Sequence, residues 1–279
     1  MGGLGRVVKP ALSAAYDNAF VQAAVEGIGV FFSSGDNGDE IDNVGDRQPD
    51  FAAVNQWVTA VGGTPIGIGA RNDYLFETGW GTTRSILTTG AWDPTPPGTY
   101  IYGSGGGTGR TFPEPRYQRG VVPRSLADYF HTGTPGRVVP DIATLGDPQT
   151  GFLVGQTQTF PDDSVSYSGY RIGGTSLSSP IMAGIEALAD QSAGHAHGFA
   201  NPAIDRLAGS GALRDVVNPA ATLSVVRVDF VNGVDATGGL RTSLRSLNQT
   251  QSLAARPGYD DVTGVGSPGA ASYVRRLGR

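Results

Sequence analysis

The chain has 279 residues, 39% of them hydrophobic, which is enough to bury a sizeable core. A net charge of −5 without a cluster of basic residues argues against nucleic acid as a partner. The absence of cysteine excludes disulfides, thiolate metal sites and cysteine nucleophiles, and a single lysine, Lys9, argues against Schiff-base chemistry. No apolar run reaches the roughly 20 residues of a membrane span, so we expect no membrane partner, and the N-terminus lacks the apolar centre of a signal peptide.

Helices and buried strands alternate through the first half of the chain. Residues 11–27 predict an amphipathic helix, and the apolar run IGVFFSSGD that follows is typical of a buried parallel strand. Residues 57–64, WVTAVGGT, and residues 137–145, RVVPDIATL, predict two further buried strands. Glycine, threonine and proline dominate residues 78–111, which we expect to form a long surface excursion. This order predicts an α/β fold around a mostly parallel sheet flanked by helices.

The second half begins with the run GGTSLSSPIMAG, residues 173–184. It predicts a tight glycine turn and then a helix to about Gln191, with Pro180 in the first turn. Residues 222–247 alternate apolar and polar side chains, with an Asn-Gly pair as a candidate hairpin turn, and we expect alternating strands only there. The tail predicts acidic loops before a short terminal helix.

Ser176 stands where the glycine turn meets the predicted helix. Backbone N–H groups and the helix dipole favour negative charge there, which suits a nucleophile, but the position also suits an ordinary N-cap. A nucleophile needs a base, and His131, His195 and His197 all lie in loop-like contexts untypical of one. If Ser176 is catalytic, we therefore expect a carboxylate base. His195 and His197, in GHAHGF, offer the alternative of a two-histidine metal clip.

Asp36 ends the run SSGD directly after a predicted strand. Ligands in open α/β sheets gather at the carboxyl ends of strands, so this position is a candidate functional site. The alternative is an Asx-turn residue with a local role only. The acidic spacing from Asp36 to Asp46 does not match an EF-hand calcium loop, and GSGGGTG lacks the third glycine of the dinucleotide-binding pattern.

Six sequence strings taken together resemble one family. They occur in the order SSGD at 33–36, WVTAVGGT at 57–64, SGGG at 104–107, VPDIA at 139–143, GGTSLSSP at 173–180 and GYDDVTGVGSP at 258–268. This order resembles the sedolisin family, which are serine-carboxyl peptidases with a subtilisin-like fold. The resemblance covers the chain from about residue 14 onward and implies a single peptidase domain over residues 1–279, with a polypeptide as its substrate.

The resemblance implies a role for each matching residue. Ser176 would be the nucleophile, although the family usually has serine rather than Gly173 three positions earlier. Asp36 would support the oxyanion, which an aspartate can do only while protonated, at acid pH or with a raised pKa. A histidine base would be charged at such a pH, which agrees with the lack of one. Peptide substrate would lie along small residues that admit its backbone, namely Ser104, Gly105, Gly106, Gly107 and Gly174.

The family also binds one structural calcium ion, and residues 213–268 match that region. The resemblance implies an all-oxygen ligand set, which suits a hard cation: the carboxylates of Asp215 and Asp260 and the carbonyls of Val216, Arg256 and Gly258. The alternative is a helix cap and a solvated acidic turn. Asp261 beside Asp260 leaves the assignment open by one position.

The family's base has no counterpart upstream of Asp36. It is a Glu followed four residues later by an Asp on one helical face, whereas the acids here are Asp17 and Glu26, nine residues apart. We therefore predict the C-terminal part of a sedolisin-like domain, without its first strands, and expect the missing N-terminal segment or a propeptide as partners. The resemblance implies a secreted parent protein.

Three functional hypotheses follow. The chain belongs to an acid-acting serine-carboxyl endopeptidase that the parent chain completes, or it is an inactive remnant that binds peptides in the old cleft. The weaker third is a subtilisin-like hydrolase with a histidine base, which shares only the string GTSLSSPIMAG.

Overall fold

The computed structural model describes residues 8–160, 162–233, 235–269 and 271–278. The start of the sequence, where we predict no first strand, includes residues 1–7, which lie outside the described residues. Three parallel strands form the central sheet in the order β1-β2-β10. Their bounds are Phe31–Ser33 for β1, Thr59–Thr64 for β2 and Ile142–Leu145 for β10.

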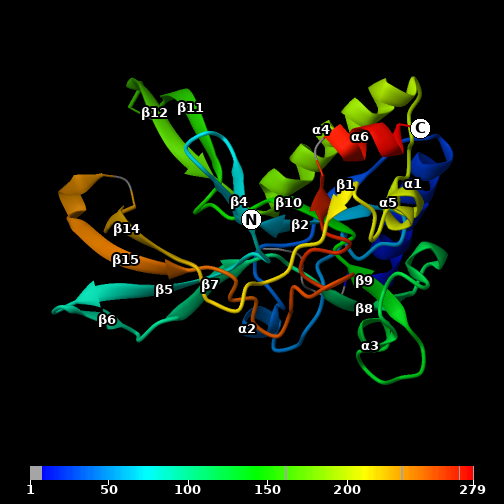
Figure 1. The fold of residues 1–279 in the computed structure, drawn as a ribbon, viewed down its shortest axis with the longest axis horizontal. Helices are drawn as coiled ribbons and strands as arrows, with labels where there is room; N and C mark the ends of the chain where they lie inside the picture. The colour runs from blue at the N-terminus through cyan, green and yellow to red at the C-terminus, as the bar shows by residue number, and fades with distance from the viewer. Residues whose placement is uncertain (1–7, 161, 234, 270, 279) are drawn as a thin grey trace.

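Helices cover both faces of this sheet, which explains why every residue of its central strand, β2, is buried (Figure 1). On one face Phe31 packs against the cluster that contains Met182 of α4 (Thr175–Ala193). On the other face Phe32 meets Phe20 of α1 (Pro10–Val25), with ring centroids 5.5 Å apart. The α/β fold with a parallel sheet and flanking helices is therefore confirmed.

The predicted strand over residues 137–145 is two strands. β9 (Gly136–Val139) pairs antiparallel with β8 (Gly107–Pro113), whereas β10 joins the parallel sheet. Pro140 lies between them and has no N–H to continue a ladder. The bend is held by a fully buried ion pair between Arg137 and Asp141.

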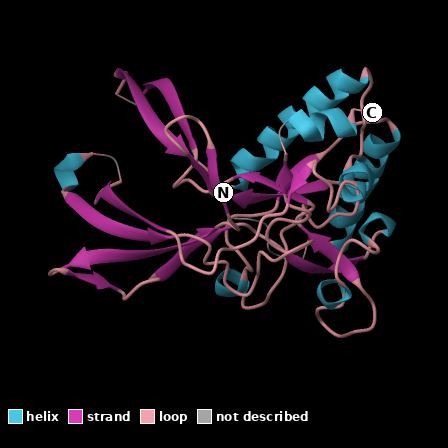
Figure 2. Ribbon diagram, viewed as in Figure 1, coloured by secondary structure: helices cyan, strands magenta, loops and turns pink. Residues whose placement is uncertain are grey.

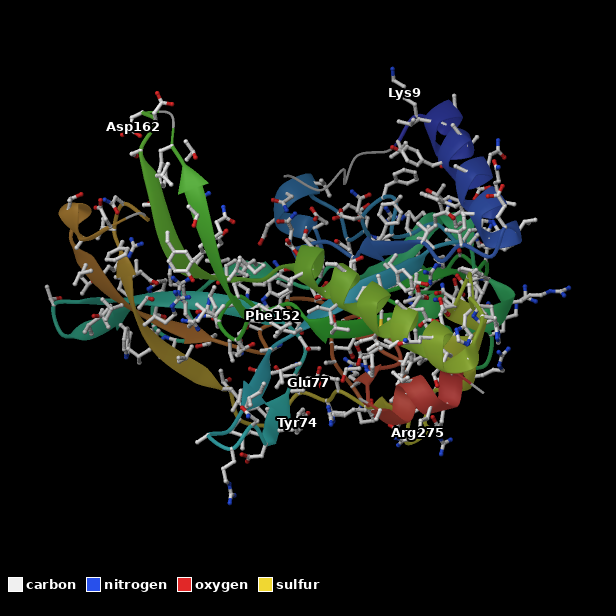
Figure 3. All side chains as sticks on the ribbon, turned by 90° about the horizontal axis from the view of Figure 1, so that it is seen from above. Lys9, Tyr74, Glu77, Phe152, Asp162 and Arg275 are labelled. Atoms are coloured by element: carbon white, nitrogen blue, oxygen red, sulfur yellow. The ribbon has the colours of Figure 1, made fainter. Side chains whose placement is uncertain are left out.

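Two β arms project from the body (Figures 1 and 2). The first is the hairpin of β11 (Phe152–Thr159) and β12 (Val165–Ile172), and Figure 3 shows Phe152 at its base and Asp162 near its tip. The second is a sheet in the order β14-β15-β5-β6, with β7 also paired to β5. Its strands are β14 (Ser224–Phe230), β15 (Leu240–Ser246), β5 (Gly81–Thr88), β6 (Ala91–Asp93) and β7 (Thr99–Gly103).

These arms change two expectations. Residues 78–111 are not a simple surface excursion, since they contain β5, β6 and β7, and most of β5 from residue 81 to 85 is buried. Antiparallel strands are not confined to residues 222–247 either. The expected hairpin there forms, but Phe230 and Leu240 close it, so the connection is longer than a two-residue turn.

The remaining elements are short. The helices are α2 (Ile41–Val44), α3 (Arg124–Ala127), α5 (Asn201–Arg206) and α6 (Ala271–Leu277), and the 3-10 turns are η1 (Arg116–Gln118) and η2 (Ala236–Gly238). The strands are β3 (Ile66–Ile68), β4 (Tyr74–Glu77), β13 (Leu213–Arg214) and β16 (Ser267–Pro268). Among the described residues, no helix has the length and apolar character needed to cross a membrane.

Candidate active site

Ser176 is the second residue of α4, and it is exposed. Gly174 caps the helix with φ 94° and ψ 157°, a backbone region open essentially to glycine alone. The predicted glycine turn before a helix is therefore present. Pro180, however, is the sixth helical residue rather than part of the first turn. Because proline has no N–H, the carbonyl of Ser176 lacks its usual helical donor.

Asp36 is bound to the start of this helix. Its Oδ1 accepts hydrogen bonds from the backbone N–H of Thr175 at 2.7 Å and from the Thr175 hydroxyl at 2.8 Å. Its Oδ2 faces Gly174, where an added Cβ would lie 2.9 Å away. The carboxyl group of Asp36 is thus fixed beside the two residues that precede Ser176.

The turn that carries Asp36 is held from both sides. The Thr175 hydroxyl accepts a hydrogen bond from the N–H of Gly35 at 3.1 Å. From the other side, the N–H of Gly105 donates to the carbonyl of Gly35 at 2.8 Å, and the N–H of Gly103 donates to the carbonyl of Asp36 at 2.9 Å. The turn is therefore a rigid part of the molecule.

Residues 104–107 pack against this turn, and all four are buried. The Ser104 hydroxyl accepts from Gly63 N–H and donates to the carbonyl of Val262. An added Cβ at Gly105 would strike the backbone of Ser34, and one at Gly106 would strike that of Asp261. The glycines do admit a close backbone, and at Gly105 and Gly106 it is the chain's own. Direct contact of residues 104–107 with a substrate stays a prediction.

Asp50 lies against the turn that carries Asp36, and sequence reasoning missed it. It is 6% exposed, and its Oδ1 has no hydrogen-bond partner among the described residues. Its carboxyl group packs so closely on Gly35 that a Cβ there would collide with it. Burial, with the nearby charges of Glu40 and Asp36, raises the pKa of Asp50 to about 7. No motif marks it in the sequence; only its contact with the Asp36 turn identifies it.

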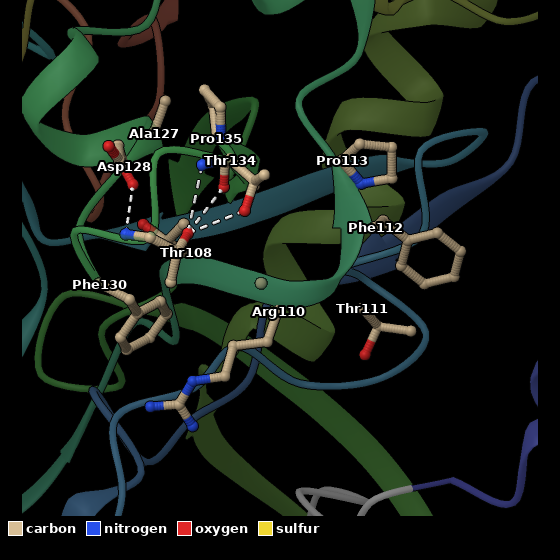
Figure 4. Close-up of a pocket in the computed structure, with 13 residues that line it drawn as sticks. Thr108, Arg110, Thr111, Phe112, Pro113, Ala127, Asp128, Phe130, Thr134 and Pro135 are labelled. Carbon is tan, nitrogen blue, oxygen red and sulfur yellow. Dashed lines mark hydrogen bonds between the residues drawn. The ribbon is translucent and has the colours of Figure 1, made fainter.

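A cavity of about 360 Å³ between β8 and the loop after α3 is separate from this site (Figure 4). The two charged side chains that line it already have partners: Asp128 accepts from the N–H groups of Thr132 and Gly133, and Arg110 stacks on Phe130 and pairs with Asp46. Of the predicted site residues, only Gly107, the first residue of β8, adjoins this lining.

Comparisons with known proteins bear on this arrangement. Over 95% of its length the chain is 29% identical to tripeptidyl-peptidase 1 of Canis lupus familiaris, and over 93% it is 30% identical to kumamolisin of Bacillus sp. (strain MN-32). Its fold matches that of Pseudomonas sedolisin, a serine-carboxyl proteinase solved with two molecules of pseudo-iodotyrostatin, with a TM-score of 0.63 and 25% identity over 94% of this chain. These matches support the sedolisin family, which the six sequence strings resemble.

These matches cover nearly all of this chain but only part of each matched protein. The chain spans 41% of the tripeptidyl-peptidase, 38% of the kumamolisin and 59% of the sedolisin chain. No family model matches it.

The acids of α1 do not provide a base for Ser176. Asp17 accepts a hydrogen bond from Asn55, and Glu26 accepts one from Gln22. A Glu-x-x-x-Asp spacing does occur at Glu186 and Asp190, but further along α4. At a rise of about 1.5 Å per residue, Glu186 lies about 15 Å along the helix axis from Ser176. It is therefore too far away to accept the proton of Ser176.

The histidines are also engaged elsewhere. His195 contacts the carbonyl of Ala193, and His197 contacts Asp190 and the carbonyl of Leu277. His131 is exposed in the loop after α3. Among the described residues, no hydrogen bond joins a histidine to Ser176, so nothing here favours a histidine-dependent hydrolase.

The expected calcium ligands fit an ion only in part. Asp215 and Gly258 lie side by side, with Gly258 N–H donating to Asp215 Oδ2 at 3.0 Å. Asp260, by contrast, accepts two hydrogen bonds on each carboxylate oxygen, from the N–H groups of Arg256, Val262 and Thr263 and from the Thr263 hydroxyl. A metal ion would have to displace some of these donors.

Asp261 does not offer a substitute ligand one position later. It is ion-paired with Arg47 and accepts a hydrogen bond from the N–H of Ala254. Val216, whose carbonyl completes the predicted set, is buried beside Asp215. Asp215, Val216, Arg256, Gly258 and Asp260 remain the candidate set.

Replacing Gly174 with alanine tests whether the Asp36 turn needs this glycine. We expect Gly174→Ala to lower the free energy of unfolding by about 1–3 kcal/mol, because its φ is strained for any side chain and its Cβ would crowd Asp36. Urea unfolding measures the change. Gly184→Ala is the matched control on the same helix, where a Cβ meets open space, and should stabilise by about 0.5–1 kcal/mol. Equal effects of the two substitutions would contradict the role given to Gly174.

Asp50 predicts a pH-dependent stability. Burial raises the pKa of Asp50 in the folded chain from its ordinary 3.8 to about 7, so the folded state keeps a proton that the unfolded state releases. Its contribution is therefore fully present below about pH 4 and is lost as the pH rises to about 7. Over this window the free energy of unfolding of Asp50→Asn should rise relative to that of the native chain, by roughly 1.4 kcal/mol for each pH unit. Chemical unfolding between pH 4 and 8 measures the change. For the control Asp93→Asn, at an exposed residue, the free energy of unfolding should vary with pH as in the native chain. The same result for Asp50→Asn would mean that the Asp50 carboxyl is solvated.

Proposed function

We propose that this chain provides the nucleophile and the oxyanion-supporting acid of a serine-carboxyl endopeptidase that cleaves polypeptides at acid pH. Ser176 would be the nucleophile and Asp36 the acid. The observation that carries the proposal is the pair of hydrogen bonds from Thr175 to Asp36 Oδ1, which ties the acid to the residue next to the serine. The relationship to a serine-carboxyl proteinase supports the same reaction class.

The hydrogen bonds suggest how Asp36 would act. A protonated carboxyl has one oxygen that only accepts and one that donates. Two donors occupy Oδ1, so the proton belongs on Oδ2, on the side that faces Gly174. When Ser176 Oγ bonds to the peptide carbonyl carbon, the carbonyl electron pair moves to oxygen, and Oδ2–H can donate to that oxygen. The substrate backbone would lie against Gly174, which has no side chain there.

The Ser176 proton still needs an acceptor. No carboxylate forms a hydrogen bond with Ser176 among the described residues, and Asp17 and Glu26 are bound elsewhere. We propose that another segment of a parent chain supplies it. The same observation favours a second candidate, an inactive domain that retains only the peptide cleft.

A peptide aldehyde separates these candidates, because it adds to a serine hydroxyl without any leaving group. The Ser176 Oγ–C bond forms, and the hydroxyl proton passes to the former aldehyde oxygen. We expect the chain to bind a peptide aldehyde at about pH 4 at least tenfold more tightly than the matched peptide alcohol. Ser176→Ala and Asp36→Asn should abolish that preference, while Ser192→Ala, an exposed serine on the same helix, should keep it. Calorimetry measures binding, and digestion of an unfolded protein at about pH 4 and pH 7 measures turnover.

The outcomes are distinct. Acid-selective cleavage lost in Ser176→Ala supports the peptidase and requires a base within this chain. Aldehyde preference without cleavage means that the nucleophile and oxyanion site are formed but the base is absent. Equal weak binding of aldehyde and alcohol to a folded chain overturns both the peptidase and a reactive Ser176.

We also propose that Asp215, Val216, Arg256, Gly258 and Asp260 bind one structural calcium ion. The contact between Asp215 and Gly258 supports a shared site, and the oxygen donors suit a hard cation. Binding would exchange part of the hydrogen bonding of Asp260 for metal coordination.

Calcium should therefore stabilise the chain. At a concentration about 100 times its Kd, calcium adds roughly 2.7 kcal/mol, which corresponds to a rise in Tm of about 5 °C or more. Asp215→Asn should remove most of this rise, whereas Asp162→Asn, at the tip of an arm, should leave it intact. Thermal unfolding with and without calcium measures it. A native chain whose Tm does not change with calcium would refute the site. The hydrogen bonds of Asp260 would then explain how its loop stays folded.

A further inference from the structure

We propose that Glu186, Asp190 and His197 form a binding site for a transition-metal ion such as Zn²⁺. The three residues lie at the end of α4 remote from Ser176. Glu186 and Asp190 are four residues apart and share one face of the helix, and His197 follows in the loop after it. One ligand atom from each lies within 4.8 Å of the other two. This site is separate from the candidate active site and from the calcium ligands.

The imidazole of His197 is oriented as a metal ligand would be. Its Nε2 lies 2.7 Å from the carbonyl of Leu277, and a carbonyl only accepts, so Nε2 carries a hydrogen. Nδ1 is then left facing Asp190 Oδ1 at 2.5 Å and Glu186 Oε1 at 3.6 Å. Two carboxylate oxygens cannot donate to it, so either a proton or a metal cation must lie at Nδ1. A metal-bound histidine commonly donates its other N–H to a backbone carbonyl in this way.

Glu186 gives an independent indication. It is 4% exposed, and its Oε2 accepts a hydrogen bond from the Tyr273 hydroxyl at 3.2 Å. Its Oε1 has no hydrogen-bond partner among the described residues and is aimed at His197 Nδ1. A buried carboxylate oxygen without a partner is costly, and a cation between it and the imidazole would remove that cost. Tyr273 meanwhile fixes the orientation of the carboxylate.

The ligand types select the metal. One imidazole with two carboxylates suits Zn²⁺ better than Ca²⁺, which prefers oxygen ligands alone. Tetrahedral Zn²⁺ with bonds near 2.0–2.2 Å holds its ligand atoms about 3.3 Å apart, so small side-chain movements suffice here. The Asp190 side chain is 32% exposed and leaves a path for the ion. The His195 ring, 5.3 Å from that of His197 between centroids, lies close enough to offer a second imidazole.

A bound ion would join three elements. Glu186 and Asp190 belong to α4, His197 to the loop that leads to α5, and both Tyr273 and Leu277 to α6. In Figure 1, α4 and α6 lie side by side. The ion would thus fix the far end of the helix that carries Ser176.

The test is a titration of the untagged, chelator-treated chain with Zn²⁺, in excess Ca²⁺ so that any oxygen-only site is filled. Calorimetry gives affinity and stoichiometry, and Co²⁺ absorption reports the ligand type without any assay of activity. We expect one ion per chain and a visible Co²⁺ spectrum typical of a site with four or five ligands. His197→Asn and Glu186→Gln should each weaken binding more than tenfold, whereas the exposed His131→Asn should leave it unchanged.

Circular dichroism establishes that each variant is folded, and Asp190→Asn, at a more exposed ligand, replaces any variant that is not. Zn²⁺ binding that persists in His197→Asn or Asp190→Asn overturns the proposal. So does a native chain that binds no Zn²⁺ under these conditions, since a proton would then satisfy Nδ1. Neither result depends on whether Ser176 is catalytic.

Discussion

The arrangement of the sheet depends on one buried ion pair. Arg137 and Asp141 are fully buried, and the guanidinium donates two parallel hydrogen bonds of 2.7 and 2.6 Å to the carboxylate. Asp141 Oδ2 also accepts the N–H of Ala60 in β2, so the pair joins the bend before β10 to the neighbouring strand. Buried charges are tolerated only when paired in this complete way, and losing one partner typically costs 3–5 kcal/mol. The pair therefore fixes where β10 enters the sheet.

The position of β10 in turn sets the position of the candidate nucleophile. Beyond the strand, the carbonyl of Gly146 accepts the N–H of Gly174, and the carbonyl of Leu145 accepts the Ser178 hydroxyl. The start of α4 is thus attached to the carboxyl end of β10. Asp36 follows the carboxyl end of β1, two strands away in the same parallel sheet. Strand ends of a parallel sheet share one edge, which is why two residues 140 positions apart, Gly35 and Thr175, share hydrogen bonds.

Sequence patterns predicted the parts of the fold whose burial is uniform. β1 and β2 were recognisable because helices or loops cover both faces, so their apolar runs are continuous. β11 and β12 escaped prediction because nearly every residue of that hairpin is exposed, which leaves no alternation to detect. The glycines at 105 and 106 indicate a close backbone, but the sequence alone does not show that the backbone of Ser34 and of Asp261 lies there. Asp50 could not be found either, since its environment is made by Gly35, Asp36 and Glu40 only after folding.

A carboxylate pair spaced by four residues also shows that a sequence pattern does not reveal what surrounds a side chain after folding. The spacing places both acids on one helical face wherever it occurs, but it does not determine what faces them. At Glu186 and Asp190 the facing groups are the imidazole of His197 and the hydroxyl of Tyr273, not a serine. Glu186 is also buried, which raises its pKa to about 6. Helical spacing thus supplies two convergent oxygens, and the packing of α6 and of the loop before α5 decides whether they hold a proton or a metal ion.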